Sequence, residues 1–186
     1  MAEEKKNNKN KIWDYKSNEN DKLAEKVEKD NSIVMTKETM AQYLISLVEY
    51  EEGDVWLEPC RGDGAFYNNF PDDIQKDWCE INEGRDYFDY DGEVDITISN
   101  PPFVPRKLFV EFTNKAMSST RKNIYWLVNI SCLNSLTPRR LDAWKQKNWF
   151  VERLHIVQDK RWFGRYVFIK FGRNHNNFYT WKTETF

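Results

Sequence analysis

The chain has 186 residues, of which 40% are hydrophobic and 16% are aromatic. This content excludes a wholly disordered chain, and the few glycines and prolines exclude collagen-like and low-complexity classes. No apolar run approaches the roughly 20 residues of a membrane span, and three cysteines without a C-x-x-C pair indicate neither a disulfide framework nor a cysteine zinc site. We therefore expect a cytoplasmic protein with reduced thiols, no membrane contact and no metal site.

The charge is distributed unevenly along the chain. Residues 31–100 contain 4 Lys/Arg and 17 Asp/Glu, whereas residues 101–186 contain 16 Lys/Arg and 5 Asp/Glu. A basic half of this size can contact a polyanion such as a nucleic acid. The alternative is that the two oppositely charged halves pair with each other or are simply solvated.

The first 30 residues differ in composition from the rest. They are rich in Lys, Asn, Glu and Asp, which predicts a disordered or loosely helical charged arm. Residues 31–186 are expected to form a single domain. Within it, the apolar spacing over residues 36–50 predicts a helix with Thr36 as its N-cap.

Strands and helices then alternate along the chain. Runs of apolar, β-branched and aromatic residues predict strands at 54–58, 77–81, 95–99, 123–130, about 150–157 and 166–172. Helices are expected at 105–118 and from Thr137, where a capping residue precedes a proline at the first helical position. The alternation indicates an α/β fold with a largely parallel sheet and no second domain.

A glycine-containing turn follows the first predicted strand. Residues 58–66 read E-P-C-R-G-D-G-A-F, and the two glycines permit left-handed φ angles and a close approach of the backbone to a ligand. The dinucleotide fingerprint needs a third glycine at position 67, which is tyrosine, so an NAD site is disfavoured. Glu80, at the end of the next predicted strand, is placed to accept hydrogen bonds from two ribose hydroxyls.

A second motif, Asn100-Pro101-Pro102-Phe103, follows the predicted strand at 95–99. Two consecutive prolines remove two backbone donors and stiffen the chain. The asparagine carbonyl and a proline-fixed backbone carbonyl then form a pair of acceptors suited to an exocyclic amino group, and the phenylalanine offers a stacking face. The motif therefore indicates chemistry on an amino group attached to a flat ring.

Taken in order, E-P-C-R-G-D-G-A-F, C-E-I and S-N-P-P-F resemble the motifs of class I S-adenosylmethionine-dependent amino methyltransferases, in particular DNA adenine-N6 methyltransferases. The resemblance covers about residues 36–130. It implies a Rossmann-like fold with a mostly parallel seven-stranded sheet, helices on both faces and an antiparallel last strand. It also implies S-adenosylmethionine as the cofactor and direct in-line methyl transfer to the N6 amino group of adenine in DNA, after base flipping.

The same resemblance implies roles for individual residues. Asn100 and the Pro101 carbonyl would accept hydrogen bonds from the target amino group, Pro102 belongs to the same rigid turn, and Phe103 would stack on the flipped base. The residues implied to bind the cofactor are Thr36, Glu58, Pro59, Cys60, Gly62, Gly64, Phe66, Glu80, Ile81 and Asp86. Thr36 would contact the methionine carboxylate, although the proline that usually follows it is Lys37 here. Glu80 would bind the ribose, Ile81 would lie against the adenine ring, and Asp86 would bind its amino group.

The Pro-Cys pair at 59–60 also occurs as a nucleophile motif in cytosine-C5 methyltransferases. In those enzymes it follows the fourth strand, whereas here it lies in the glycine loop. This reading is therefore rejected.

Basic and aromatic side chains alternate in the C-terminal half and predict contacts to phosphates. The candidates are Arg139, Arg140, Lys160, Arg161, Trp162 and Arg165. No segment is long enough for a separate target-recognition domain, so a second copy of the chain or a partner subunit could supply specificity. DNA is favoured over RNA.

Two further readings stay open. One is an enzyme with the same motif but another substrate, either an amino group of an RNA base or a protein glutamine amide. The other is a non-catalytic, nucleic-acid-binding subunit with a methyltransferase fold.

Overall fold

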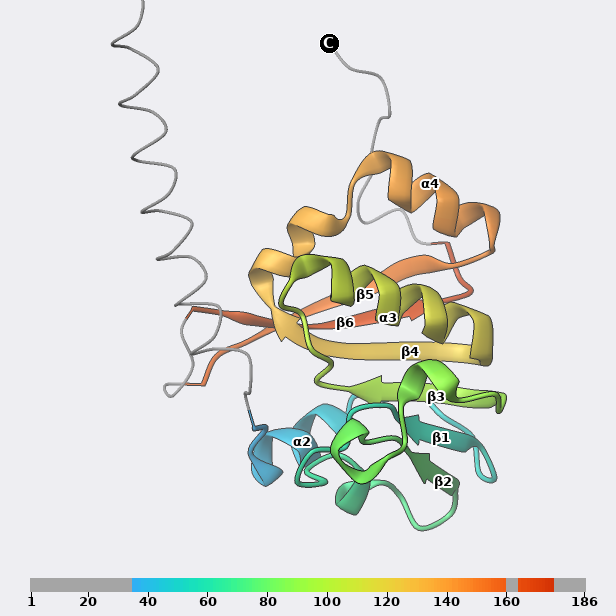
Figure 1. Ribbon diagram of the computed structural model, residues 1–186, viewed down its shortest axis with the longest axis vertical. Coiled ribbons are helices and arrows are strands. Elements are labelled where there is room, and N and C mark those ends of the chain that lie inside the picture. Colours follow the sequence, from blue (N-terminus) through green and yellow to red (C-terminus); the bar gives the residue numbers. More distant parts are fainter. Residues whose placement is uncertain (1–34, 160–163, 176–186) are drawn as a thin grey trace, which may run out of the picture. The chain divides into compact units, whose positions relative to one another are not determined.

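The computed structural model describes residues 35–159 and 164–175 (Figure 1). The strands are β1 (Val55–Glu58), β2 (Gln75–Trp78), β3 (Val94–Ser99), β4 (Thr120–Asn129), β5 (Phe150–Val157) and β6 (Tyr166–Gly172). The α-helices are α2 (Glu38–Ile45), α3 (Arg106–Ser119) and α4 (Pro138–Gln146). Four short 3-10 helices are η1 (Tyr67–Asn69), η2 (Ile81–Glu83), η3 (Tyr87–Asp89) and η4 (Ile130–Ser135). The charged arm predicted at 1–30 lies outside the described residues.

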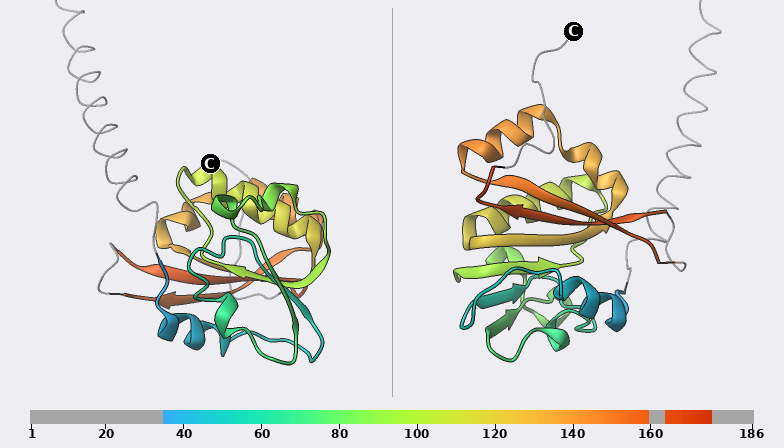
Figure 2. Two further views of the ribbon diagram at one scale, coloured as in Figure 1. Left: turned by 60° about the horizontal axis from the view of Figure 1, so that its bottom comes forward. Right: turned by 180° about the vertical axis from the view of Figure 1, so that it is seen from behind.

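The strands form one sheet in the order β2-β1-β3-β4-β6-β5. β1 pairs in parallel with β2 and β3, and β3 pairs in parallel with β4. β6 runs antiparallel between β4 and β5, and Figure 2 shows this end of the sheet from behind. The α/β class, the mostly parallel sheet and the antiparallel last strand are therefore confirmed.

The described residues contain six strands, not the seven that the resemblance implies. After β2 the chain forms η2 and η3, each begun by an acidic side chain that caps a backbone N–H. Glu80 accepts from the N–H of Asn82 at 3.1 Å, and Asp86 accepts from that of Phe88 at 2.9 Å. These local bonds, in a segment rich in Gly and Asp, favour turns over a further extended strand.

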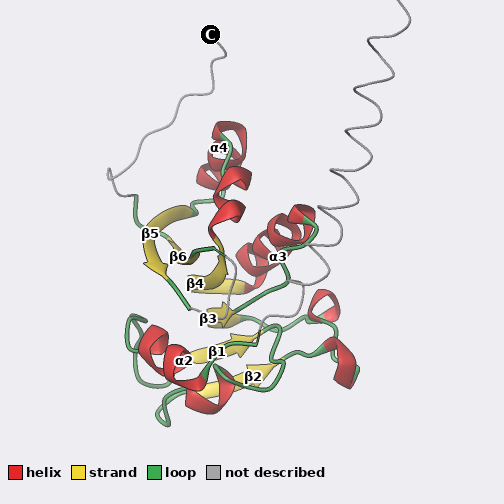
Figure 3. Cartoon of the chain, turned by 90° about the vertical axis from the view of Figure 1, so that its left-hand side faces the viewer, coloured by secondary structure: helices red, strands yellow, loops and turns green. Residues whose placement is uncertain are grey.

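Side chains alternate along the central strand β4 and fill two cores. Ile124, Trp126 and Val128 face α3 and α4, while Tyr125 and Leu127 pack in the cluster that contains α2. Figure 3 shows α3 and α4 on one side of the sheet and α2 on the other. Helices on both faces are thereby confirmed.

Helix α2 is shorter than the predicted helix over 36–50, and Thr36 is not its cap. The N-cap is Lys37, which has extended backbone angles and makes no side-chain capping bond. The Thr36 hydroxyl instead accepts a hydrogen bond from Asn100. At the other end, the Ser46 hydroxyl donates to the Tyr43 carbonyl at 2.6 Å, a local bond that competes with continued helix. The start of α4 is as predicted, because the Thr137 hydroxyl accepts from the N–H of Arg140.

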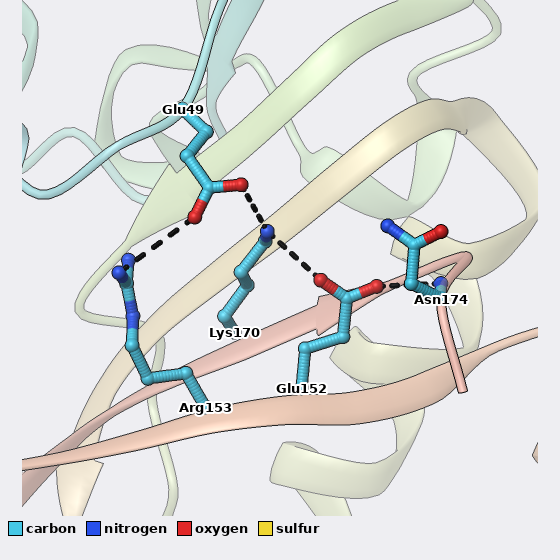
Figure 4. Close-up of a pocket in the computed structure, with 5 residues that line it drawn as sticks. All are labelled: Glu49, Glu152, Arg153, Lys170 and Asn174. Atoms are coloured by element: carbon cyan, nitrogen blue, oxygen red, sulfur yellow. Dashed lines mark hydrogen bonds and ion pairs between the residues drawn. The ribbon is translucent and has the colours of Figure 1, made fainter. Parts of the chain in front are cut away.

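A buried lysine joins β5 and β6 to the segment after α2 (Figure 4). The Lys170 ammonium lies 2.7 Å from the Glu49 carboxylate and 2.8 Å from the Glu152 carboxylate, and only 6% of its side chain is exposed. The second Glu152 oxygen accepts from the N–H of Asn174. These residues and Arg153 line a cavity of about 250 Å³. Opposite charges face each other across it, so the cluster serves to hold three chain segments together.

None of the helices in the described ranges is both long enough and apolar enough to span a bilayer.

Candidate active site

Both motifs of the sequence lie at the carboxyl edge of the sheet. The glycine loop follows β1, and the Asn100 loop follows the neighbouring strand β3. The Ser99 hydroxyl donates to the carbonyl of Cys60 at 3.3 Å and so joins the two loops. In open α/β sheets, ligands bind at this edge, outside the carboxyl ends of the strands.

The glycine loop has the backbone conformation that the sequence predicts. Gly62 and Gly64 have φ angles of 53° and 84°, in the region that disfavours side chains. A Cβ at Gly64 would also lie 2.8 Å from the side-chain nitrogen of Asn68. The loop is therefore a surface of bare backbone, and substitution at either glycine would distort it.

Glu80 ties this loop to the end of β2. One carboxylate oxygen accepts from the N–H of Gly62 at 2.9 Å. The other accepts from the backbone and side-chain nitrogens of Asn82. A ribose bound at this carboxylate would lie against the Gly62 backbone, so the predicted ribose acceptor and the predicted glycine loop form one surface.

Two further candidates border that surface. Ile81 opens η2, and 69% of it is exposed, an unusual exposure for a large apolar side chain beside a loop of bare backbone. Asp86 is half-buried and begins η3. Both stand in the part of the fold where the resemblance expects an adenine ring, and their roles stay predictions.

Glu58 lies at the base of the glycine loop and is only 2% exposed. One of its oxygens accepts from the N–H of Tyr67 at 2.8 Å. Burial raises the pKa of Glu58 to about 9, and the negative charges of Asp63 and Glu80 add to the rise. The bond from Tyr67 and the charge of Arg61 lower this pKa, but they do not outweigh burial. At neutral pH the carboxyl group is therefore protonated.

We expect Glu58→Gln to be more stable than the wild type by about 3 kcal/mol at pH 7. The folded state holds the Glu58 proton up to about pH 9, whereas the unfolded chain releases it near pH 4.5. The contribution of this group to stability is thus complete below pH 4.5 and is lost as the pH rises to about 9. Urea denaturation between pH 4 and 9 checks this, because the two curves should converge near pH 4 and diverge above it. Parallel curves would contradict it.

The Asn100 loop is held from two sides. The Asn100 side-chain nitrogen donates to the Thr36 hydroxyl at 3.3 Å. Pro101 is buried, Pro102 is half-buried, and the ring of Phe103 meets that of Tyr166 edge to face, with centroids 6.1 Å apart. Both ends of the motif are therefore held by contacts to other segments of the chain. The sequence reasoning did not identify Tyr166, which lies on β6, as the support of Phe103.

The sequence matches no family model and no curated protein. The fold, in contrast, matches solved methyltransferases. The 23S rRNA methyltransferase ErmE aligns with a TM-score of 0.60 and 12% identity, over 76% of this chain and 70% of that one. A methyltransferase from Pyrococcus furiosus aligns with a TM-score of 0.55 and 14% identity, over 76% and 85% of the two chains.

A third solved structure, the magnesium protoporphyrin IX methyltransferase of Synechocystis with bound S-adenosylmethionine, aligns with a TM-score of 0.53 and 9% identity, over 73% of this chain and 77% of that one. The chain has the class I methyltransferase fold. Its sheet has the order β2-β1-β3-β4-β6-β5, with β6 antiparallel to both of its neighbours.

Of the basic residues that were predicted to contact phosphates, those in the described part of this methyltransferase fold lie near the carboxyl end of β4, the strand next to β3. Arg139 is exposed in the first turn of α4, which begins after the carboxyl end of β4. Arg165 is exposed at the start of the antiparallel β6, and its carbonyl accepts from the N–H of Ile130. Arg140 is half-buried, and its guanidinium donates to the Ser135 carbonyl. Lys160, Arg161 and Trp162 lie outside the described residues.

Two further exposed cations were missed by the sequence reasoning. Arg106 and Lys107 begin α3, shortly after the Asn100 loop. Their short separation from Asn100 in the sequence was a signal that could have identified them. They extend the basic rim of this methyltransferase fold along the same edge.

The three cysteines are free thiols, as predicted. Burial raises the pKa of Cys60 well above its usual value, and it raises the pKa of Cys79 to about 11. A thiol of this kind is a poor nucleophile at neutral pH, which agrees with the rejection of the Pro59-Cys60 pair as a nucleophile motif. Over residues 35–159 and 164–175, no group of three or more His, Cys, Asp or Glu is arranged to hold a metal ion.

Proposed function

We propose that this chain is an S-adenosylmethionine-dependent methyltransferase that acts on the exocyclic N6 amino group of adenine in DNA. One observation carries the proposal: the Asn100-Pro-Pro-Phe loop and the glycine loop leave adjacent strands and are joined by the bond from Ser99 to Cys60. The proposed site for a flat amino-bearing ring would therefore lie beside the proposed site for a ribose-bearing ligand.

The residues of the glycine loop fit the cofactor. The bare backbone at Gly62 and Gly64 leaves room for the methionine part, and the Glu80 carboxylate suits a vicinal diol. The acidic groups around the loop, Asp63 among them, suit a ligand with a sulfonium and an ammonium group. When bound, S-adenosylmethionine would supply an electrophilic methyl group at this edge.

The Asn100 loop would prepare the amino group. The side-chain oxygen of Asn100 and the carbonyl of Pro101 accept its two N–H bonds, which withdraws its lone pair from conjugation with the ring. Phe103, held by Tyr166, stacks on the base and fixes its plane. The residues act by positioning and hydrogen bonding, and no covalent intermediate with the protein is needed.

The exposed arginines support a nucleic acid as the substrate. Arg106, Arg139 and Arg165 lie along the rim beside Asn100, where they could contact phosphates on both sides of a flipped base. Such contacts position the strand and carry no sequence information. Recognition of a particular DNA site would then need a second copy or a partner subunit.

We expect the double variant Arg139→Gln/Arg165→Gln to bind duplex DNA about tenfold more weakly at 100 mM salt, with little change in cofactor affinity. The slope of log affinity against log salt should fall by about two, one for each cation removed. Fluorescence anisotropy over a salt series checks both effects. Lys145→Gln, at the opposite end of α4, is the control and should leave the slope unchanged. Equal slopes in all three proteins would contradict the proposed rim.

The experiment that tests the function is transfer of tritiated methyl groups from S-adenosylmethionine to duplex DNA, single-stranded DNA and total RNA, followed by nucleoside analysis. N6-methyladenine in DNA supports the proposal. Label in RNA alone would mean that the same reaction takes place on an amino group of an RNA base. Cofactor binding without label in any nucleic acid would overturn the proposal in favour of a non-catalytic subunit or a protein substrate.

A further inference from the structure

The three residues before α2 lie between the two loops of the site. The end of the Met35 side chain is 3.7 Å from the position that a Cβ on Gly62 would occupy. The Lys37 carbonyl accepts from the N–H groups of Met40 and Ala41, and its ammonium lies 3.8 Å from the buried carboxylate of Asp159. Thr36, between these anchors, is only 8% exposed. Its place relative to the site is therefore set from both sides.

The side chain of Thr36 is directed at Asn100. The hydroxyl oxygen accepts from the Asn100 side-chain nitrogen at 3.3 Å. A carboxamide carries its NH2 group and its oxygen on opposite branches, so a bond that fixes the NH2 group also fixes the direction of the oxygen.

We propose that Thr36 is a positioning residue that holds the side chain of Asn100 in place for the amino group of the substrate. This inference rests on the proposed function. It differs from the role that the family resemblance implies for Thr36, which is contact with the methionine carboxylate. The side chain of Thr36 acts through Asn100, and the cofactor does not depend on it.

Thr36→Val tests this assignment, because valine has nearly the shape of threonine without the hydroxyl. Methyl transfer by the variant should show a kcat about tenfold lower, the size of effect that loss of one hydrogen bond produces. The Kd for S-adenosylmethionine, measured by calorimetry, should stay within about twofold of the wild-type value. Thr36→Ser keeps the hydroxyl and should restore kcat.

A weaker cofactor affinity in Thr36→Val with an unchanged kcat would overturn the inference and make Thr36 a cofactor ligand. A readout without turnover separates this failure from failure of the proposed function. The side-chain NH2 signals of Asn100, assigned by their loss in Asn100→Asp, should shift and exchange faster with water in Thr36→Val than in the wild type or Thr36→Ser. Unchanged signals would overturn the inference even if the wild type transfers no methyl group.

Discussion

Asn100→Ala should lower the rate of methyl transfer at least about a hundredfold, while the fold and the cofactor affinity stay as in the wild type. The variant removes the side-chain acceptor that stands at the end of β3, and the Pro101 carbonyl cannot replace it because the prolines hold the backbone in place. Acceptors aimed at charge that develops during a reaction contribute most when they are fixed beforehand, and the Asn100 amide is bonded to Thr36. Single-turnover assays with labelled cofactor measure the effect.

Two further variants make this result interpretable. Asn100→Asp keeps a side-chain oxygen but loses the donor to Thr36, so its rate of methyl transfer should fall between those of the wild type and Asn100→Ala. Asn134→Ala changes an exposed asparagine in η4 and should be fully active. Circular dichroism and cofactor binding report whether the fold persists. Full activity of Asn100→Ala would exclude the proposed chemistry at this loop.

The second large effect concerns stability. Lys170→Met should lower the free energy of unfolding by about 3 to 5 kcal/mol, because it leaves the Glu152 carboxylate buried without its cation. The double variant Lys170→Met/Glu152→Gln removes both charges and should recover a large part of the loss. Urea denaturation at pH 7 measures the wild type, both single variants and the double variant, and additive losses would show that the two side chains do not interact.

The same cluster predicts a dependence on pH. The hydrogen bond and the charge of Lys170 hold the pKa of Glu49 below its usual value, although burial acts in the opposite direction. A carboxylate with a lowered pKa contributes stability above its unfolded pKa, and this contribution is lost as the pH falls through the folded value. The wild type should therefore lose stability below about pH 4.5 more steeply than Lys170→Met does.

Most of the strands could be predicted because each is a run of apolar, β-branched and aromatic residues that is bounded by turn formers. The predicted strand at 95–99 corresponds to Val94–Ser99, and the two late strands have the predicted bounds. Helix α2 was predicted too long, since its apolar pattern continues past Ile45 while a bond from Ser46 ends the helix. The strand count was taken from the family resemblance, and capping by Glu80 and Asp86 turns the chain after β2 into 3-10 helices.

The site was predicted from local motifs. The prediction did not include the contacts between segments that are distant in the sequence. Asn100 and the glycine loop could be identified because each motif is a short run of residues. The bond from Asn100 to Thr36 joins positions 64 residues apart, and the ring of Tyr166 reaches Phe103 from another strand. No periodicity or spacing in the sequence encodes such pairs, because they depend on how the strands are ordered in the sheet.

The position of β6 has a consequence for how the protein is made. β6 is the last of the six described strands in chain order, yet it lies inside the sheet and its side chains enter both cores. A nascent chain on the ribosome that has not yet reached Tyr166 exposes the free edge of β4 and leaves β5 without the strand that it pairs with in the sheet. An unpaired edge of this kind is a template for aggregation. The parallel strands can pair earlier, but the sheet is complete only after β6 has been inserted between β4 and β5.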